Sequence, residues 1–320
     1  MFLTLTVQLG PAILAASRLL SCTMHALHRR PPAFGPASTT SRPRFRIKMQ
    51  NRNNEQMTRL DDVATIQEKL SSFYLEALSA LRRSEAFKAE QTEMLSAPFL
   101  LNVHAAKAYF KAPIRVMFVG QETKGWLCRL PEVLDDPTTR VPALLAKYEK
   151  GLLADPGHSL FLRTRRLLES ELTGGVPGSV IWNNLFKMDV YKGKGKSRNA
   201  RNHSVALTEF SAKLFRFERE LLQPDVMIFG CSATHDNVVK SLFEAPTRQT
   251  VRIHVPKELW HFRHGRIDCF RTLHPAVARF GRHRTVQKHY QTIIQEIKSR
   301  KQDSFAADAI LHQAAKTAMM

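Results

Sequence analysis

The chain has 320 residues, of which 43% are hydrophobic and 24% charged, a composition that excludes an intrinsically disordered protein. No apolar run reaches the roughly 18 residues that a membrane-spanning helix needs, so no membrane partner is expected. The formal net charge is +20, which favours a polyanionic partner because neutralising phosphates releases counterions. The alternative is a basic protein that its charge merely keeps soluble.

Residues 1–54 carry eight Lys or Arg and no acidic residue, which predicts a disordered basic leader. No cation precedes the apolar stretch 2–20, so a secretory signal is poorly supported. Two interpretations stay open. The segment is either an organelle transit peptide, or upstream sequence before a working start at Met49 or Met57. The first predicts an organelle-targeted protein. The second, with residues 1–48 as a mis-assigned start, predicts a cytoplasmic, nucleoid-associated one.

The rest of the chain alternates between helical and strand patterns. Apolar residues at helical spacing predict helices at 61–94 (one helix, or two broken near Ser84), 142–150, 159–172, 205–222, 233–243 and 285–298. Short, continuous apolar runs predict buried strands at 114–120, 179–182, 225–230, 250–255 and 268–273. This order predicts an α/β protein, a three-layer α/β/α sandwich with a mainly parallel central sheet. One domain at 60–300, followed by a tail at 301–320, is the simplest division.

Polar residues follow three of these strands. They are Gln121 and Glu122 after Gly120, the pair Asn183-Asn184, and His274. Carboxyl ends of parallel strands share one edge of a sheet, where ligands bind in open α/β folds. A carboxylate can activate water and face the cationic sugar that forms as an N-glycosidic bond breaks. An amide matches the edge of a pyrimidine, and an imidazole can donate a hydrogen bond to a ring carbonyl.

Other site classes are poorly supported. The four cysteines (Cys22, Cys128, Cys231, Cys269) share no short spacing, so neither a zinc site nor a disulfide framework is expected. The chain lacks a phosphate-binding P-loop, a GxGxxG motif, and a Ser or Cys in an elbow setting. Simpler interpretations remain, with Glu122 as a solvated loop residue and His274 as a structural histidine.

A loop at 187–203 is rich in cations and follows the strand that ends at Asn184. It is either a solvated flexible loop or a set of phosphate contacts. Its cations are Lys187, Lys192, Lys194, Lys196, Arg198 and Arg201.

Four short motifs resemble those of uracil-DNA glycosylases. The stretch Val119-Gly120-Gln121-Glu122 is similar to the start of their Gly-Gln-Asp-Pro-Tyr-His motif, and Leu273-His274-Pro275-Ala276 to their His-Pro-Ser motif. Trp182-Asn183-Asn184-Leu185 lies where that family has its base-reading Asn, and 224–233 resembles the strand segment before the last part of that fold. The resemblance covers residues 112–298, and it is the order and spacing of the motifs that make it specific.

The resemblance implies roles for particular residues. Glu122 would activate water and His274 would act on the base carbonyl. It further implies a protein that flips its target nucleotide out of DNA and works as a monomer without metal or cofactor. The implied base-binding residues are Gly120, Gln121, Asn183, Asn184 and Trp126, with filling the core as the preferred interpretation of Trp126. The implied contacts to the DNA backbone are Lys192, Lys194, Lys196, Arg198, Pro275, Ala276 and Arg279.

The sequence also departs from this pattern. Thr123-Lys124-Gly125-Trp126 replaces Pro-Tyr-His, so the Tyr that excludes thymine is missing, and Ala276 replaces the Ser. The family's Leu wedge is absent, and Phe280 is the candidate substitute. A divergent glycosylase acting on uracil or a related damaged base is therefore the first hypothesis. The alternatives are a DNA-binding module of the same fold without catalysis, and an α/β enzyme of nucleosides or nucleotides.

Overall fold

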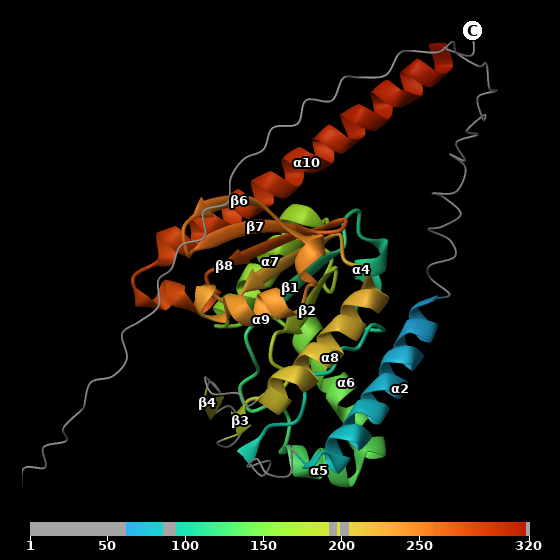
Figure 1. The fold of residues 1–320 in the computed structure, drawn as a ribbon, viewed down its shortest axis with the longest axis vertical. Helices are drawn as coiled ribbons and strands as arrows, with labels where there is room; N and C mark the ends of the chain where they lie inside the picture. The colour runs from blue at the N-terminus through green and yellow to red at the C-terminus, as the bar shows by residue number, and fades with distance from the viewer. Residues whose placement is uncertain (1–61, 86–93, 192–196, 199–204, 318–320) are drawn as a thin grey trace, which may run out of the picture. The chain divides into compact units, whose positions relative to one another are not determined.

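The computed structural model describes residues 62–85, 94–191, 197–198 and 205–317, with the side chains of 191, 197–198 and 301–317 left out. These residues form an α/β fold around a six-stranded mixed, mostly parallel sheet (Figure 1). The strand order is β2-β1-β5-β8-β7-β6. The bounds are Val116–Gly120 for β1, Val180–Asn184 for β2, Val226–Gly230 for β5, Arg248–Val255 for β6, Leu259–His264 for β7 and Ile267–Thr272 for β8.

The parallel part of the sheet is its buried centre. β1 pairs in parallel with β2 and β5, and β5 pairs in parallel with β8. Every residue of β1 and of β5 is buried, which is why both strands read as continuous apolar runs. Alternate side chains of β1 enter different cores: Met117 packs with α2, α6 and α8, and Phe118 packs with α7 and α10. Helices therefore cover both faces of the sheet.

The helices lie between the strands in sequence. The longer ones are α2 (Asp62–Arg83), α6 (Pro137–Leu153), α7 (Leu160–Leu172), α8 (Val205–Leu222) and α10 (His283–Thr317). Short ones are α4 (Lys107–Lys111), α5 (Leu130–Asp135), α9 (Asp236–Ser241) and the 3-10 turns η2 (Ala233–His235), η3 (Ala245–Thr247) and η4 (Pro275–Phe280). Two strands of two residues each, β3 (Val190–Tyr191) and β4 (Ser197–Arg198), pair antiparallel with each other.

The α/β architecture is confirmed, and several elements differ from the sequence prediction. β6 and β7 are antiparallel, because tight turns at Lys257 (φ 59°) and Gly265 (φ 54°) connect β6 to β7 and β7 to β8. The sequence analysis did not predict β7 at all. Pro137, and not Pro142, occupies the first turn of α6, and Pro142 lies inside the helix. Helix α10 continues past Arg300 to Thr317.

Two further sequence predictions concern parts outside this description. The leader at 1–54 and the loop cations Lys192, Lys194, Lys196 and Arg201 lie outside the described residues.

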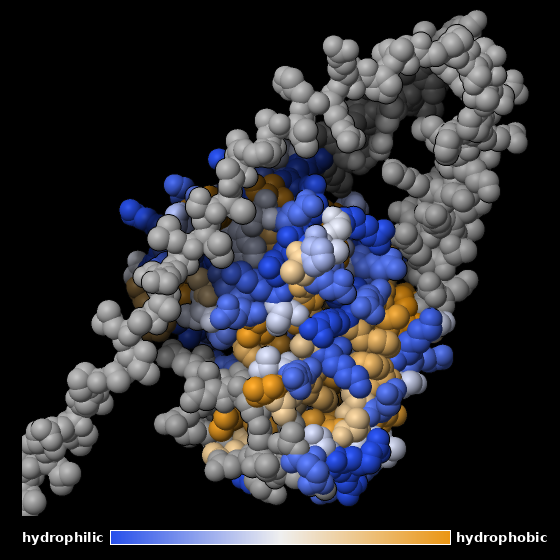
Figure 2. All heavy atoms as spheres, in the orientation of Figure 1, coloured by the Kyte–Doolittle hydropathy of each residue, from blue (hydrophilic) through white to orange (hydrophobic). Residues whose placement is uncertain are grey.

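Within the described ranges, no helix combines the length and apolar content needed to cross a membrane. In the view of Figure 2, hydrophilic residues predominate over β6, β7 and β8, whereas hydrophobic residues reach the surface around α8.

Candidate functional site

Three parallel strand ends are joined by direct hydrogen bonds. The side-chain amide of Gln121, after β1, donates to the carbonyl of Cys231, after β5 (2.8 Å). The backbone N–H of Ser232 donates to the carbonyl of Thr272 at the end of β8 (2.9 Å). The backbone N–H of His274 in turn donates to Ser232 Oγ (3.1 Å). The loops that follow β1, β5 and β8 therefore form one connected edge.

His274 is held in a defined orientation at this edge. Its Nδ1 accepts a hydrogen bond from the backbone N–H of Ala276 (3.1 Å), so in the neutral ring the proton lies on Nε2. The ring stacks on Phe161 with centroids 5.8 Å apart and 16° between the planes. Burial, helped by the charges of Lys124 and His235, lowers the pKa of His274 to about 4. At neutral pH this imidazole is therefore an uncharged hydrogen-bond donor.

The loop that carries Glu122 is fixed by a buried carboxylate. Asp189 accepts hydrogen bonds from Thr123 Oγ1 (3.1 Å) and from the backbone N–H of Gly125 (2.9 Å). Glu122 itself is half-buried and lies between two fixed neighbours. Lys124, two residues beyond Glu122, is one of the charges that lower the pKa of His274. Glu122 and His274 each stand two residues beyond a parallel strand, at the same edge of the sheet.

Gly120, the last residue of β1, is closely packed at this edge. A Cβ placed on Gly120 would lie 2.6 Å from Asn184 Oδ1 and 3.1 Å from the ring of Phe161. Asn184 Oδ1 already accepts from Trp182 Nε1 (3.0 Å). Asn184 Nδ2 is buried and has no partner within the described part of the chain. An available amide donor thus lies next to an aromatic ring and a bare backbone.

Asn183 lies on the opposite face of β2 and does not belong to this edge. Its Nδ2 donates to Glu218 (2.9 Å), and its Oδ1 accepts from Lys187 Nζ (2.6 Å). Neighbouring residues of a strand point to opposite faces, so only one of the two asparagines can face the site. The amide candidate is therefore Asn184. Lys187 is fully buried as well, and so it is not one of the loop cations.

Trp126 packs in the interior. Its ring contacts Phe99 (centroids 5.0 Å apart) and Trp182 (5.9 Å), and it is 8% exposed. Lys147 lies over the same ring, with Nζ 5.6 Å from the centroid. These contacts and the low exposure of the side chain agree with the core interpretation.

The residues after His274 divide into buried and exposed positions. Pro275 is buried, and the backbone N–H of Ala276 is occupied by His274, so neither has an N–H to offer a phosphate. Arg279 is exposed and donates to the carbonyl of His158 (3.2 Å). Phe280 is 80% exposed at the end of η4. Of the cationic loop, only the backbone of Arg198 is described, in β4, while Lys192, Lys194 and Lys196 lie outside.

Three residues that position the site had not been predicted. Phe161 in the first turn of α7 stacks on both Phe118 (4.3 Å) and His274. Ser232, which follows β5 and has a positive φ (65°), bonds to both Thr272 at the end of β8 and His274. Asp189 fixes the loop that carries Glu122. Of these three residues, only Ser232 could have been found from the sequence, because it is a polar residue shortly after the predicted strand that ends at Gly230. The contacts of Phe161 and Asp189 depend on tertiary structure.

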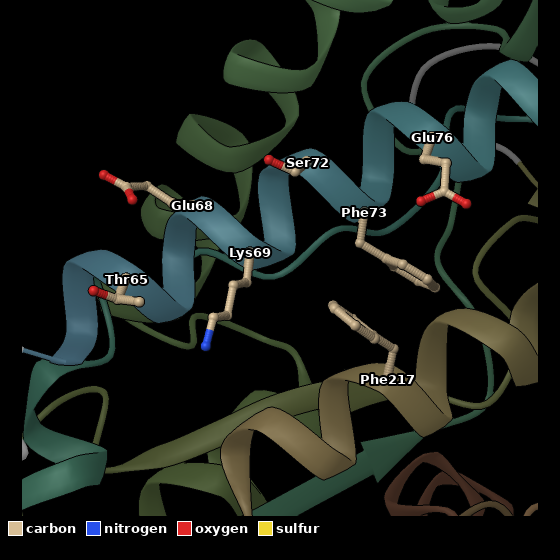
Figure 3. A pocket seen from close by; sticks show the side chains of 7 residues that line it. All are labelled: Thr65, Glu68, Lys69, Ser72, Phe73, Glu76 and Phe217. Carbon is tan, nitrogen blue, oxygen red and sulfur yellow. The ribbon is translucent and has the colours of Figure 1, made fainter.

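A separate groove is lined by none of the residues at these strand ends. It has a volume of about 480 Å³ and lies along α2 and α8, where Phe73 stacks on Phe217 with centroids 3.8 Å apart (Figure 3). Its charged lining residues are Glu68, Lys69 and Glu76, and its lining includes no histidine. This groove therefore lacks the acid, imidazole and amide set of the strand ends.

No protein-family model matches the chain, and no curated protein matches it either. The function is accordingly argued from the groups that meet at the strand ends.

The tight fit around Gly120 predicts the effect of Gly120→Ala. The added methyl would force Asn184 or Phe161 to move, so we expect a loss of about 1–3 kcal/mol in the free energy of unfolding. Gly151→Ala in α6 is the matched control, because its Cβ would meet Trp182 at an ordinary 3.4 Å and would improve helix propensity. Urea unfolding of both variants tests this. Equal stability of Gly120→Ala and wild type would contradict the close packing.

Proposed function

We propose that this chain is a DNA glycosylase, which hydrolyses the N-glycosidic bond of uracil or a related damaged base after flipping it out of DNA. Its fold would be the three-layer α/β/α sandwich of the uracil-DNA glycosylases that the motifs resemble. The observation that carries the proposal is His274, an uncharged Nε2–H donor at the same edge of the parallel sheet as Glu122. A pair of this kind suits a reaction that makes a sugar cation and a base anion together.

Each group has a defined part in the reaction. The bond between C1′ of the sugar and the base nitrogen breaks, and its electron pair leaves with the base. His274 donates a hydrogen bond from Nε2 to the ring carbonyl, where negative charge develops. Glu122 faces the sugar cation and accepts a proton from the water whose oxygen bonds to C1′. A neutral imidazole performs this role without first losing a proton.

The base would be recognised beside Gly120. Asn184 Nδ2 has no partner among the described residues and is the candidate donor for a pyrimidine carbonyl. The missing Tyr of the family motif leaves thymine among the bases to be tested.

Contacts to DNA would come from the surface around η4. Phe280 is the most exposed large hydrophobic residue described, and it follows His274 by six positions. An apolar side chain there can enter a base step and hold the duplex open. Arg279 and the net charge of +20 would supply phosphate contacts that weaken with salt.

The test is a panel of oligonucleotides, each with one lesion, in single-stranded, paired and mismatched form. Uracil and other damaged pyrimidines are included, with thymine opposite guanine as a specificity probe. Incubation followed by alkali should cleave at least one of them, and the double variant Glu122→Gln/His274→Ala should abolish that cleavage. DNA binding is measured in parallel at two salt concentrations.

The outcomes separate the three candidate classes. Cleavage that the double variant retains would place the chemistry elsewhere and contradict the assigned site. No cleavage across the panel, with salt-sensitive DNA binding that the double variant keeps, would favour a non-catalytic binding module. Neither cleavage nor DNA binding at physiological salt would favour an enzyme of free nucleosides or nucleotides.

A further inference from the structure

Two histidines and a glutamate gather at the antiparallel edge of the sheet. His254 lies in β6, His261 in β7 and Glu296 in α10, which runs beside these strands (Figure 1). One nitrogen or oxygen from each lies within 4.8 Å of those of the other two. The imidazole rings of His254 and His261 are nearly parallel, with centroids 6.2 Å apart.

A break in the strand register brings His254 into this group. The pairing of β6 with β7 shifts between Ile253 and Val255, so His254 occupies an irregular position. Irregularities of this kind re-aim a side chain and recur next to functional sites. His254 is thereby turned inward although both its neighbours in the strand pair normally with β7. Its side chain is only 9% exposed.

Both histidines have a lone pair that a cation could use. His254 Nε2 is buried without a hydrogen-bond partner among the described residues, 3.9 Å from Glu296 Oε1. An unpartnered buried nitrogen is costly, so its retention calls for an explanation. His261 Nε2 lies 3.2 Å from Asp268 Oδ1 and thus carries the proton, which leaves the lone pair on Nδ1.

We infer that His254, His261 and Glu296 form a binding site for a divalent transition metal, with Zn²⁺ as the best match. Two imidazoles and one carboxylate are a ligand set that tetrahedral zinc accepts, with a fourth position left for water or another ligand. Asp268 would orient His261 through the second ring nitrogen, the usual arrangement for a metal-binding histidine. The bound metal would thereby cross-link the β6–β7 hairpin to α10.

The surrounding charges permit this binding. Arg300 already forms a close ion pair with Asp268 (2.6 Å), and its contact with His261 Nδ1 is a weak 3.5 Å. A metal would displace only that weak contact. Arg252 is 67% exposed and lies 3.9 Å from Glu296, so it can turn into solvent. Arg263 is bonded to Asp268 rather than to the three ligands.

A groove of about 510 Å³ between the hairpin and α10 borders one of the three proposed ligands. His254 forms part of its wall, with Lys288, His289 and Thr292 of α10. A cation could enter here, and the fourth coordination position would face this space. The cysteine spacing gave no sign of such a site, because the ligands are histidines and a carboxylate far apart in sequence.

The test uses the full chain after treatment with a chelator. Zn²⁺ is titrated by calorimetry, and Co²⁺ serves as a spectroscopic probe because tetrahedral Co²⁺ absorbs visible light strongly. Wild type should bind one equivalent that His254→Ala and Glu296→Gln each remove or weaken at least about tenfold. His283→Ala is the matched control, since it removes an exposed histidine from the same helix.

Thermal unfolding supplies a second measurement. Zn²⁺ should raise the melting temperature of wild type and of His283→Ala, and raise it less in Glu296→Gln, because a ligand that binds the folded state stabilises it. The leader has histidines of its own, so any equivalent that His254→Ala retains is assigned to other groups. Identical titrations for wild type, His254→Ala and Glu296→Gln would overturn the inference. The outcome is independent of glycosylase activity.

Discussion

Replacing His274 with Ala should lower the rate of base excision by about 10²–10³-fold, the loss typical of one preorganised donor at a developing oxyanion. The ring is held by Ala276 on one nitrogen and by Phe161 on its face, so its donor is in place before the substrate arrives. The variant removes stabilisation that exists only in the transition state. We therefore expect the loss in kcat, with little change in KM.

Single-turnover kinetics on the best oligonucleotide of the panel measures this effect. His283→Ala removes an exposed histidine at the start of α10 and should retain full activity. Circular dichroism confirms that the fold of each variant is intact. A His274→Ala protein with wild-type kcat would remove His274 from the reaction, even if the excision activity itself is real.

The protonation state of His274 can be measured without any substrate. Its pKa is lowered to about 4 in the folded protein, so the unfolded chain binds more protons between about pH 4 and 6.5. Stability contributed by the neutral ring is therefore complete above pH 6.5 and declines as the pH falls toward 4. NMR titration of the imidazole of His274 should show a neutral ring with Nε2–H at pH 6. Titration near 6.5, or a proton on Nδ1, would contradict the assignment.

The central strands and the shared edge could be predicted from the sequence. Runs such as 114–120 and 225–230 are continuously apolar because both faces of β1 and β5 are covered. The parallel order then places Glu122 and His274 at one edge. β7 escaped prediction because His261, Arg263 and His264 interrupt its apolar pattern, although His261 is buried against Phe270.

The details of the site depend on contacts that no local pattern specifies. The choice between Asn183 and Asn184 depends on the phase of the strand, since a shift of one residue reverses both faces. Asp189 reaches the Glu122 loop from 66 positions away in the chain, through Thr123. Likewise Phe161 lies beside His274 only because α7 packs on the sheet. The residue types therefore suggested a candidate chemistry, but only the tertiary structure shows which residues lie together at the candidate site.

A fully buried ion pair beneath the site predicts the largest effect on stability. Lys187 Nζ lies 2.6 Å from Glu218 Oε2, and neither side chain is exposed to solvent. Tyr74 donates to the other oxygen of Glu218 (2.9 Å), and Asn183 bonds to both charged groups. Burial lowers the pKa of Lys187, against the opposing effect of Glu218. Each charge is therefore tolerated only because its partner is present.

Lys187→Met and Glu218→Gln should each reduce the free energy of unfolding by about 3–5 kcal/mol, because each leaves an uncompensated buried charge. The double variant should lose much less than the sum of the two, since no isolated charge remains. Arg82→Ala is the control. Its partner Asp135 is 4.0 Å away and both are largely exposed, so we expect a change within about 0.5 kcal/mol.

Urea unfolding of the wild type, both single variants and the double variant completes the cycle. The pair also fixes Asn183, whose Oδ1 accepts the backbone N–H of Asn184 (2.7 Å), so its loss should reach the candidate site. Excision by Glu218→Gln should therefore fall even at temperatures where the protein stays folded. Strictly additive losses would show that Lys187 and Glu218 do not stabilise each other. Unchanged excision by a folded Glu218→Gln protein would show that the buried network does not act on the candidate site.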